Sequence, residues 1–153
     1  METITSKETA SVLEDLIKIN NDRIAGYEKA LKDVKPEDAD LRILFLKAID
    51  QSRAIRMTLG TELQTLKADI PTGTSGSGSI HRAWLDLKAT FTGHNRHAVL
   101  SSCEFGEDAT QKAYESALSS EHLPEYLASI VLSEKEELKA FHDEIKALRD
   151  QVA

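Results

Sequence analysis

The 153-residue sequence predicts an all-α domain, residues 1–153, built from two helical hairpins. Apolar residues recur at alternating steps of three and four through four long segments, which is the spacing of an amphipathic helix. No stretch alternates apolar and polar residues for long enough to predict a strand. Short connections at residues 32–37 and 119–124 join the segments in pairs, so each pair is expected to run antiparallel.

The first predicted helix carries its apolar stripe from Leu13 to Leu31. The second is expected to begin near Pro36, because proline lacks an N–H and is tolerated in the first turn of a helix. Its stripe continues to Leu66. Residues 70–79, which follow, are rich in glycine and serine and predict a flexible linker that ends the first hairpin.

The crossover between the hairpins spans about residues 69–95 and contains one short amphipathic helix. The apolar face of this helix is formed by Ile80, Trp84, Leu87 and Phe91. Such a face packs either across the bundle or at a dimer contact, so a homodimer through the Trp84 helix is one expected partnership. Two long helices follow, the third with its stripe from Leu100 to Leu118 and the fourth beginning near Pro124.

A short internal repeat predicts the topology. The repeated segments are Gly26-Tyr27-Glu28-Lys29-Ala30-Leu31 and Ala113-Tyr114-Glu115-Ser116-Ala117-Leu118. If two related hairpins pack side by side, the second and third long helices run parallel, and the crossover must travel the length of the bundle. A helix of about 25 residues is about 37 Å long, whereas a linker of about 27 residues can reach about 90 Å. One long crossover between two hairpins is the ferritin-like variant of the four-helix bundle.

The charge, the length of the apolar runs and the cysteine content limit which partners and which cellular location are expected. Lys and Arg number 19 against 26 Asp and Glu, a formal net charge of −7, and the basic residues do not cluster, so no nucleic-acid partner is expected. The longest apolar runs are as short as residues 43–46, and the N-terminus lacks the pattern of a signal peptide, so neither membrane spanning nor secretion is expected. The single cysteine, Cys103, is expected to be a buried, inert thiol in a cytoplasmic protein.

Three motifs also resemble those of a known family. They are His81-Arg82-Ala83-Trp84-Leu85-Asp86-Leu87-Lys88, Glu104-Phe105-Gly106-Glu107-Asp108-Ala109 and Lys112-Ala113-Tyr114. Together they resemble a family of bacterial ferritin-like four-helix-bundle proteins of unknown function, and the similarity extends over nearly the whole chain. The resemblance implies a ferritin-like fold and a general association with bacterial stress responses.

Ferritin-like diiron proteins place a Glu from each of two helices and a Glu-x-x-His from each of the other two inside the bundle. The candidate ligands for iron or manganese in this sequence lie in its last two long helices and are Glu104, Glu107, Glu134, Glu137 and His142. The set is incomplete, because Asn20 is the repeat partner of Glu107 and because Glu137 precedes His142 by five residues rather than three. Only half of a diiron site can be recognised.

Buried carboxylates without a metal need protonation, ordered water or a basic partner, for which Arg53 and Arg56 are the expected candidates. An interior Asn20 facing Glu107 would instead form a hydrogen bond that fixes the helix register. The first hypothesis is therefore a non-enzymatic, stress-related or partner-binding bundle without a cofactor. The competing hypothesis is an iron- or manganese-binding oxidase or iron-handling protein that uses the five candidate ligands.

Overall fold

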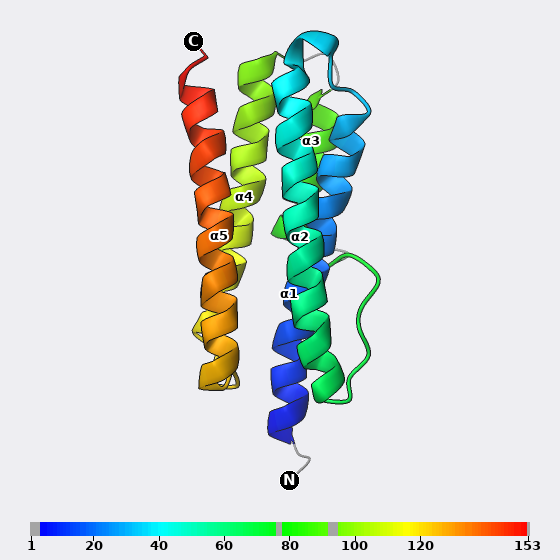
Figure 1. Ribbon diagram of the computed structural model, residues 1–153, viewed down its shortest axis with the longest axis vertical. Coiled ribbons are helices and arrows are strands. Elements are labelled where there is room, and N and C mark those ends of the chain that lie inside the picture. The colour runs from blue at the N-terminus through cyan, green and yellow to red at the C-terminus, as the bar shows by residue number, and fades with distance from the viewer. Residues whose placement is uncertain (1–3, 76–77, 92–94, 153) are drawn as a thin grey trace.

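A computed structural model describes residues 4–75, 78–91 and 95–152 (Figure 1). Its elements are α1 (Ile4–Leu31), the 3-10 helix η1 (Pro36–Asp38), α2 (Ala39–Thr65), α3 (Ser79–Phe91), α4 (Arg96–Leu118) and α5 (Glu125–Asp150). The described residues contain no strand, so the predicted all-α class is confirmed. None of the described helices is both long enough and apolar enough to cross a membrane.

The four long helices form two antiparallel hairpins, α1 with α2 and α4 with α5 (Figure 1). In Figure 1, α1 and α5 run upward while α2 and α4 run downward. The second and third long helices are therefore parallel, as the internal repeat predicts. The crossover climbs back along the bundle, and its helix α3 packs against α1 and α4.

The second helix begins later than the sequence predicts. Pro36 lies in the 3-10 helix η1, and α2 begins only at Ala39. Lys35 is extended, with φ −78° and ψ 153°, because the ring of a following proline disfavours the helical conformation. The proline thus ends the loop and starts a tight turn that leads into the helix.

The C-terminus of α2 is capped by backbone hydrogen bonds. Lys67 has a φ of 61°, which places it in the left-handed region. Its N–H donates to the carbonyl of Gln64, and the N–H of Ala68 donates to the carbonyl of Leu63, both at 3.0 Å. This is the Schellman ending of a helix. Leu66, the last predicted stripe position, is the C-cap residue.

The described part of the linker, predicted to be flexible, is attached to α1. The Asn21 side chain donates to the carbonyl of Gly73 at 2.9 Å. The buried carboxylate of Asp22 accepts hydrogen bonds from the backbone N–H and the hydroxyl of Ser75, and it lies 2.9 Å from Nδ1 of His81. Two neighbouring residues of α1 therefore hold both the linker and the start of α3.

Trp84 places α3 within the bundle. Its ring packs between Gly26 of α1 and Gly106 of α4, where a Cβ would lie 3.0 Å and 2.9 Å from the indole. Its Nε1 donates to the hydroxyl of Thr110 at 3.3 Å, and the side chain is only 2% exposed. The glycines therefore create the space that the indole fills. The side chain of Phe91, predicted on the same face, lies outside the described ones.

The apolar core has two parts with a polar layer between them. One part includes Phe45 and Phe141, and the other includes Leu13 and Leu127. The buried polar residues of the layer are Asn20, Arg23, Ser52, Glu107 and Glu134. These polar side chains separate the two apolar parts of the core.

Candidate functional site

A buried ion pair forms the centre of the polar layer. Arg23 of α1 is 0% exposed, and its Nε donates to Oε2 of Glu107 of α4 at 2.9 Å. The same oxygen accepts a hydrogen bond from the hydroxyl of Tyr27 at 2.6 Å. Nη1 of Arg23 donates to the carbonyl of Ala48 and to Oγ of Ser52, both in α2, at 3.1 and 2.9 Å. One guanidinium therefore links three helices.

A chain of hydrogen bonds continues from Ser52 of α2 to Glu134 of α5. The hydroxyl of Ser52 donates to Oδ1 of Asn20 at 2.8 Å. Nδ2 of Asn20 donates to the carbonyl of Leu16 and to the hydroxyl of Tyr114, at 2.8 and 3.0 Å. Tyr114 in turn donates to Oε1 of Glu134 at 3.2 Å. Every long helix contributes to the network.

Burial disfavours the charged forms of several ionisable groups in and beside the layer. Burial raises the pKa of Tyr27 and of Tyr114 well above the usual value, and the adjacent carboxylates raise it further. Burial also raises the pKa of Glu134 to about 8, although the hydrogen bond from Tyr114 opposes this shift. The thiol of Cys103 is buried, as predicted, and its burial raises its pKa so that the thiolate is disfavoured.

Two of the five predicted metal ligands lie in this layer. Glu107 is already bonded to Arg23 and Tyr27, so its charge is neutralised by a side chain of the same protein. Glu134 contacts Tyr114 and has no basic partner among the described residues. The two carboxylates are thus held by different neighbours, and no described histidine belongs to the layer.

The basic partner predicted for the buried carboxylates was wrong. Arg53 bonds to Glu28 on the surface at 2.9 Å, and Arg56 bonds to the side chain of Asn21 at 2.9 Å. Arg23 is the partner instead. Asn20 also differs from its prediction, since its bonds go to other groups of the layer and not to Glu107. The available signal was the position of Arg23, three residues after Asn20 on the same face of the helix.

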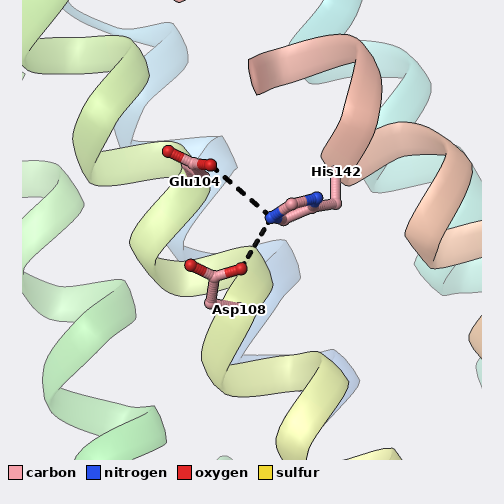
Figure 2. Close-up of side chains that lie close together, drawn as sticks. All are labelled: Glu104, Asp108 and His142. Carbon is pink, nitrogen blue, oxygen red and sulfur yellow. Dashed lines mark ion pairs between the residues drawn. The ribbon is translucent and has the colours of Figure 1, made fainter. Parts of the chain in front are cut away.

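Two other predicted ligands meet on the surface between α4 and α5. Figure 2 shows Glu104 and Asp108 projecting from one helix toward His142 on the other. Nε2 of His142 lies 2.6 Å from Asp108 Oδ1 and 3.7 Å from Glu104 Oε2. One ligand atom from each of the three residues lies within 4.8 Å of the others. We refer to these three residues as the α4–α5 group.

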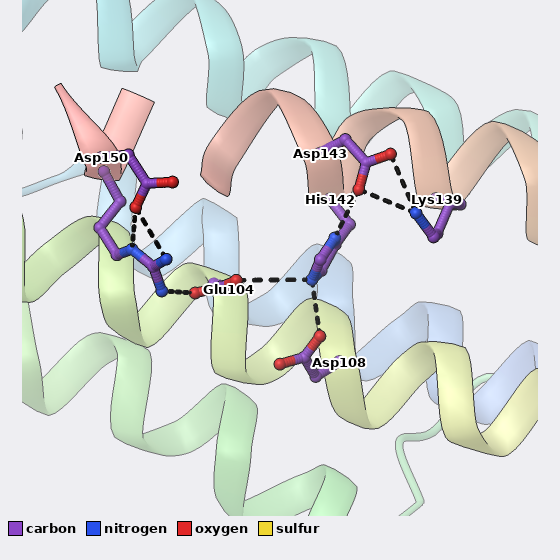
Figure 3. A network of polar contacts seen from close by, with 7 residues as sticks. Glu104, Asp108, Lys139, His142, Asp143 and Asp150 are labelled. Atoms are coloured by element: carbon purple, nitrogen blue, oxygen red, sulfur yellow. Dashed lines mark hydrogen bonds and ion pairs between the residues drawn. The ribbon is translucent and has the colours of Figure 1, made fainter. Parts of the chain in front are cut away.

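The surroundings of this group orient the imidazole (Figure 3). Nδ1 of His142 lies 3.0 Å from the Asp143 carboxylate, which also contacts Lys139 at 3.0 Å. These contacts lower the pKa of Asp143, with His142 as the larger cause. Because Nδ1 contacts Asp143, Nε2 is turned toward the carboxylates of Glu104 and Asp108. Neither carboxylate is aligned to form a hydrogen bond with Nε2. Arg149 also forms an ion pair with Glu104, so it competes with His142 for this carboxylate.

The structure therefore regroups the predicted ligands. Glu104 and His142 come together, and Asp108 joins them as a residue that the prediction missed. The spacing from Glu104 to Asp108 was the available signal, since residues four apart share one face of a helix. Glu137, the fifth candidate, is exposed and lines a groove with Glu134 between α2 and α5.

Comparison with known proteins identifies a family but no activity. The family described as a domain of unknown function, DUF2383, matches residues 8–121, from the first turns of α1 to the turn that follows α4. No curated protein matches the chain. Because the match covers most of the sequence, the chain belongs to the DUF2383 family.

Proposed function

We propose that this protein is a cytoplasmic, ferritin-like bundle without a diiron centre, which acts by binding a partner rather than as an enzyme. The direction of its four long helices and the single long crossover support the ferritin-like arrangement. The resemblance of its central motifs to bacterial stress-associated proteins supports a role in the stress response of a bacterium. Its formal net charge of −7 supports a partner other than nucleic acid.

The guanidinium of Arg23 is the observation that carries this proposal. It is buried inside the bundle, the region in which ferritin-like diiron proteins hold carboxylates and imidazoles around two cations. Arginine stays protonated in proteins, so it supplies a permanent positive charge to Glu107. A metal at Glu107 would leave that charge buried and unpaired, which costs about 3–5 kcal/mol.

Iron loading tests the proposal. The His142→Gln variant, which disables the α4–α5 group, is incubated anaerobically with ferrous iron, desalted and analysed for metal, and its absorbance is then followed in air. We expect less than about one iron per chain and no oxidation transient, because the interior ligand is already paired. Two irons per chain with a transient would overturn the proposal.

A second candidate function is the binding of one divalent ion, iron or manganese, by the α4–α5 group. Two carboxylates and an imidazole provide oxygen and nitrogen donors that suit either ion. The ligand atoms lie within 4.8 Å of one another, and Nε2 of His142 contacts Asp108 at 2.6 Å but has no aligned hydrogen bond among the described residues. An ion there would have to compete with Arg149 for Glu104, so binding is expected to be weak.

Titration with Mn²⁺, followed by the loss of the free-ion magnetic resonance signal, tests this second function. We expect one ion per chain in the wild type and affinity at least about tenfold lower after His142→Gln. His122→Gln is a matched control, because His122 also contacts a carboxylate, Glu8 at 2.6 Å, at a distant surface. Equal affinity in the wild type and His142→Gln would exclude the site.

The proposed partner includes a second copy of the chain, bound through the outer side of α3. Trp84 itself is buried in the bundle, so truncating it would test folding rather than assembly. Leu85 is the better probe, because it lies on the same helix and is 44% exposed. Light scattering should give a dimer mass for the wild type and a monomer mass for Leu85→Glu. A monomeric wild type would exclude this contact.

A further inference from the structure

A surface groove of about 400 Å³ lies between α2 and α5. Ile55 of α2 and Ile130 of α5 provide apolar walls, while Thr58 and Ser133 add hydroxyl groups. The crossover helix packs against α1 and α4, so it covers the other pair of long helices. The groove is therefore open to a ligand that has both apolar and polar parts.

Two carboxyl groups line this groove, and one oxygen of the deeper group has no hydrogen-bond partner among the described residues. Glu134 is 6% exposed, and its Oε2 has no hydrogen-bond partner, whereas its Oε1 accepts from Tyr114. A buried carboxyl oxygen without a hydrogen-bond partner is costly, since it has lost its hydration. Glu137 follows three residues later and is exposed. Among the residues that the structure describes, the groove thus has carboxyl groups at two depths and no basic side chain in its lining.

We propose that this groove binds a linear aliphatic diamine, with one ammonium at Glu134 and the other at Glu137. Residues three apart on a helix have Cβ atoms about 5–6 Å apart, a span that a three- or four-carbon chain bridges. The hydrocarbon would pack against Ile55 and Ile130, and each ammonium brings three N–H donors for carboxylate and hydroxyl oxygens. The terminal torsion of a glutamate is broad, so the carboxyl group of Glu134 can turn toward the ligand.

Proton release is expected to accompany binding. Burial raises the pKa of Glu134 to about 8, so the empty groove holds mostly the neutral acid at pH 7. The titratable groups that act on it are Tyr114 of α4 and Glu137 of α5, while α2 lines the groove with alanine, isoleucine and threonine only. An ammonium favours the ionised carboxylate, so affinity should rise between pH 6 and pH 8.

Calorimetric titration with 1,4-diaminobutane in about 150 mM salt tests the proposal, because such salt screens diffuse attraction to the acidic surface. We expect saturable one-to-one binding, weakened at least about tenfold by Glu134→Gln. Glu137→Gln should reduce the affinity to that of butylamine on the wild type. Glu136→Gln is the matched control, since it removes an exposed charge from the same helix outside the groove and should change nothing.

Three outcomes would overturn the proposal. One is the absence of saturation in the wild type. Another is equal weakening by Glu134→Gln and Glu136→Gln, which would indicate attraction to net charge alone. The third is unchanged binding in a Glu134→Gln variant whose circular dichroism matches the wild type.

Discussion

The helix α4 has two acidic regions that differ in burial and in partner, one in the interior and one on the surface. Glu107 faces inward and is 1% exposed, and its charge is paired with Arg23. Glu104 and Asp108, which lie one turn apart on the side of α4 that faces α5, contact His142 (Figure 2). The same residue chemistry therefore yields a sealed ion pair in one place and an open group of donors in the other.

A side chain of the same protein can therefore supply the cation for a buried carboxylate. In the interior, the guanidinium of Arg23 is already present and oriented by Ser52 and Ala48, so the charge of Glu107 is balanced within the chain. On the surface, the group around His142 is reached by solvent, since Asp108 is 51% exposed. Solvent therefore reaches the second region and is excluded from the Arg23–Glu107 pair, and variants of each region can separate the two cases.

The largest effect is expected from breaking the interior pair. Arg23→Met should lower the free energy of unfolding by about 3–5 kcal/mol, because Glu107 is left buried without its partner, and Glu107→Leu should cost a similar amount. The double variant should lose much less than the sum of the two. Urea unfolding of all four proteins gives the coupling energy. Strictly additive losses would mean that the pair acts as two independent residues.

Glu134 differs from Glu107, because it is an interior carboxyl group with no basic partner among the residues that the structure describes. Its pKa of about 8 in the fold exceeds the ordinary 4.5, so the unfolded chain ionises first and stability falls as pH rises from about 4.5 to 8. Glu134→Gln removes this loss, and its advantage over the wild type should grow from about zero at pH 4.5 to about 2–4 kcal/mol at pH 8. Urea unfolding across this range measures it. Glu136→Gln should show no such trend, and a difference independent of pH would contradict the assignment.

Gly106 tests what fixes the rotation of α4 between the two regions. A Cβ there would lie 2.9 Å from the indole of Trp84, so Gly106→Ala should destabilise by about 1–3 kcal/mol despite the better helix propensity of alanine. Gly60→Ala is the control, since its Cβ would meet only the flexible end of Ile70, at 3.0 Å. Thermal unfolding compares them. Equal stability of the two variants would show that Trp84 does not hold α4 in place.

The helices of this fold could be predicted because their signals are local. Stripe spacing and the residues around Pro124 predicted the long helices, and the repeat predicted that α2 and α4 run parallel. Asp108 could also have been predicted, because it follows Glu104 by four residues and so shares its face of the helix. The role of Arg23 could not, because it depends on how α1 is rotated against α4, and the bonded residues are 84 positions apart. The burial of Trp84 likewise depends on two glycines in different helices.

The smallest effect is expected from the surface region. Glu104→Gln and His142→Gln should each change the free energy of unfolding by about 1 kcal/mol or less, because partly solvated ion pairs gain little over their hydrated ions. Raising the salt to about 1 M shortens the screening length to about 3 Å, so this small difference should shrink further. The loss caused by Arg23→Met should persist in the same salt, since its charges are excluded from solvent. Urea unfolding at low and high salt separates the two cases, and a salt-sensitive interior loss would mean that water reaches the Arg23–Glu107 pair.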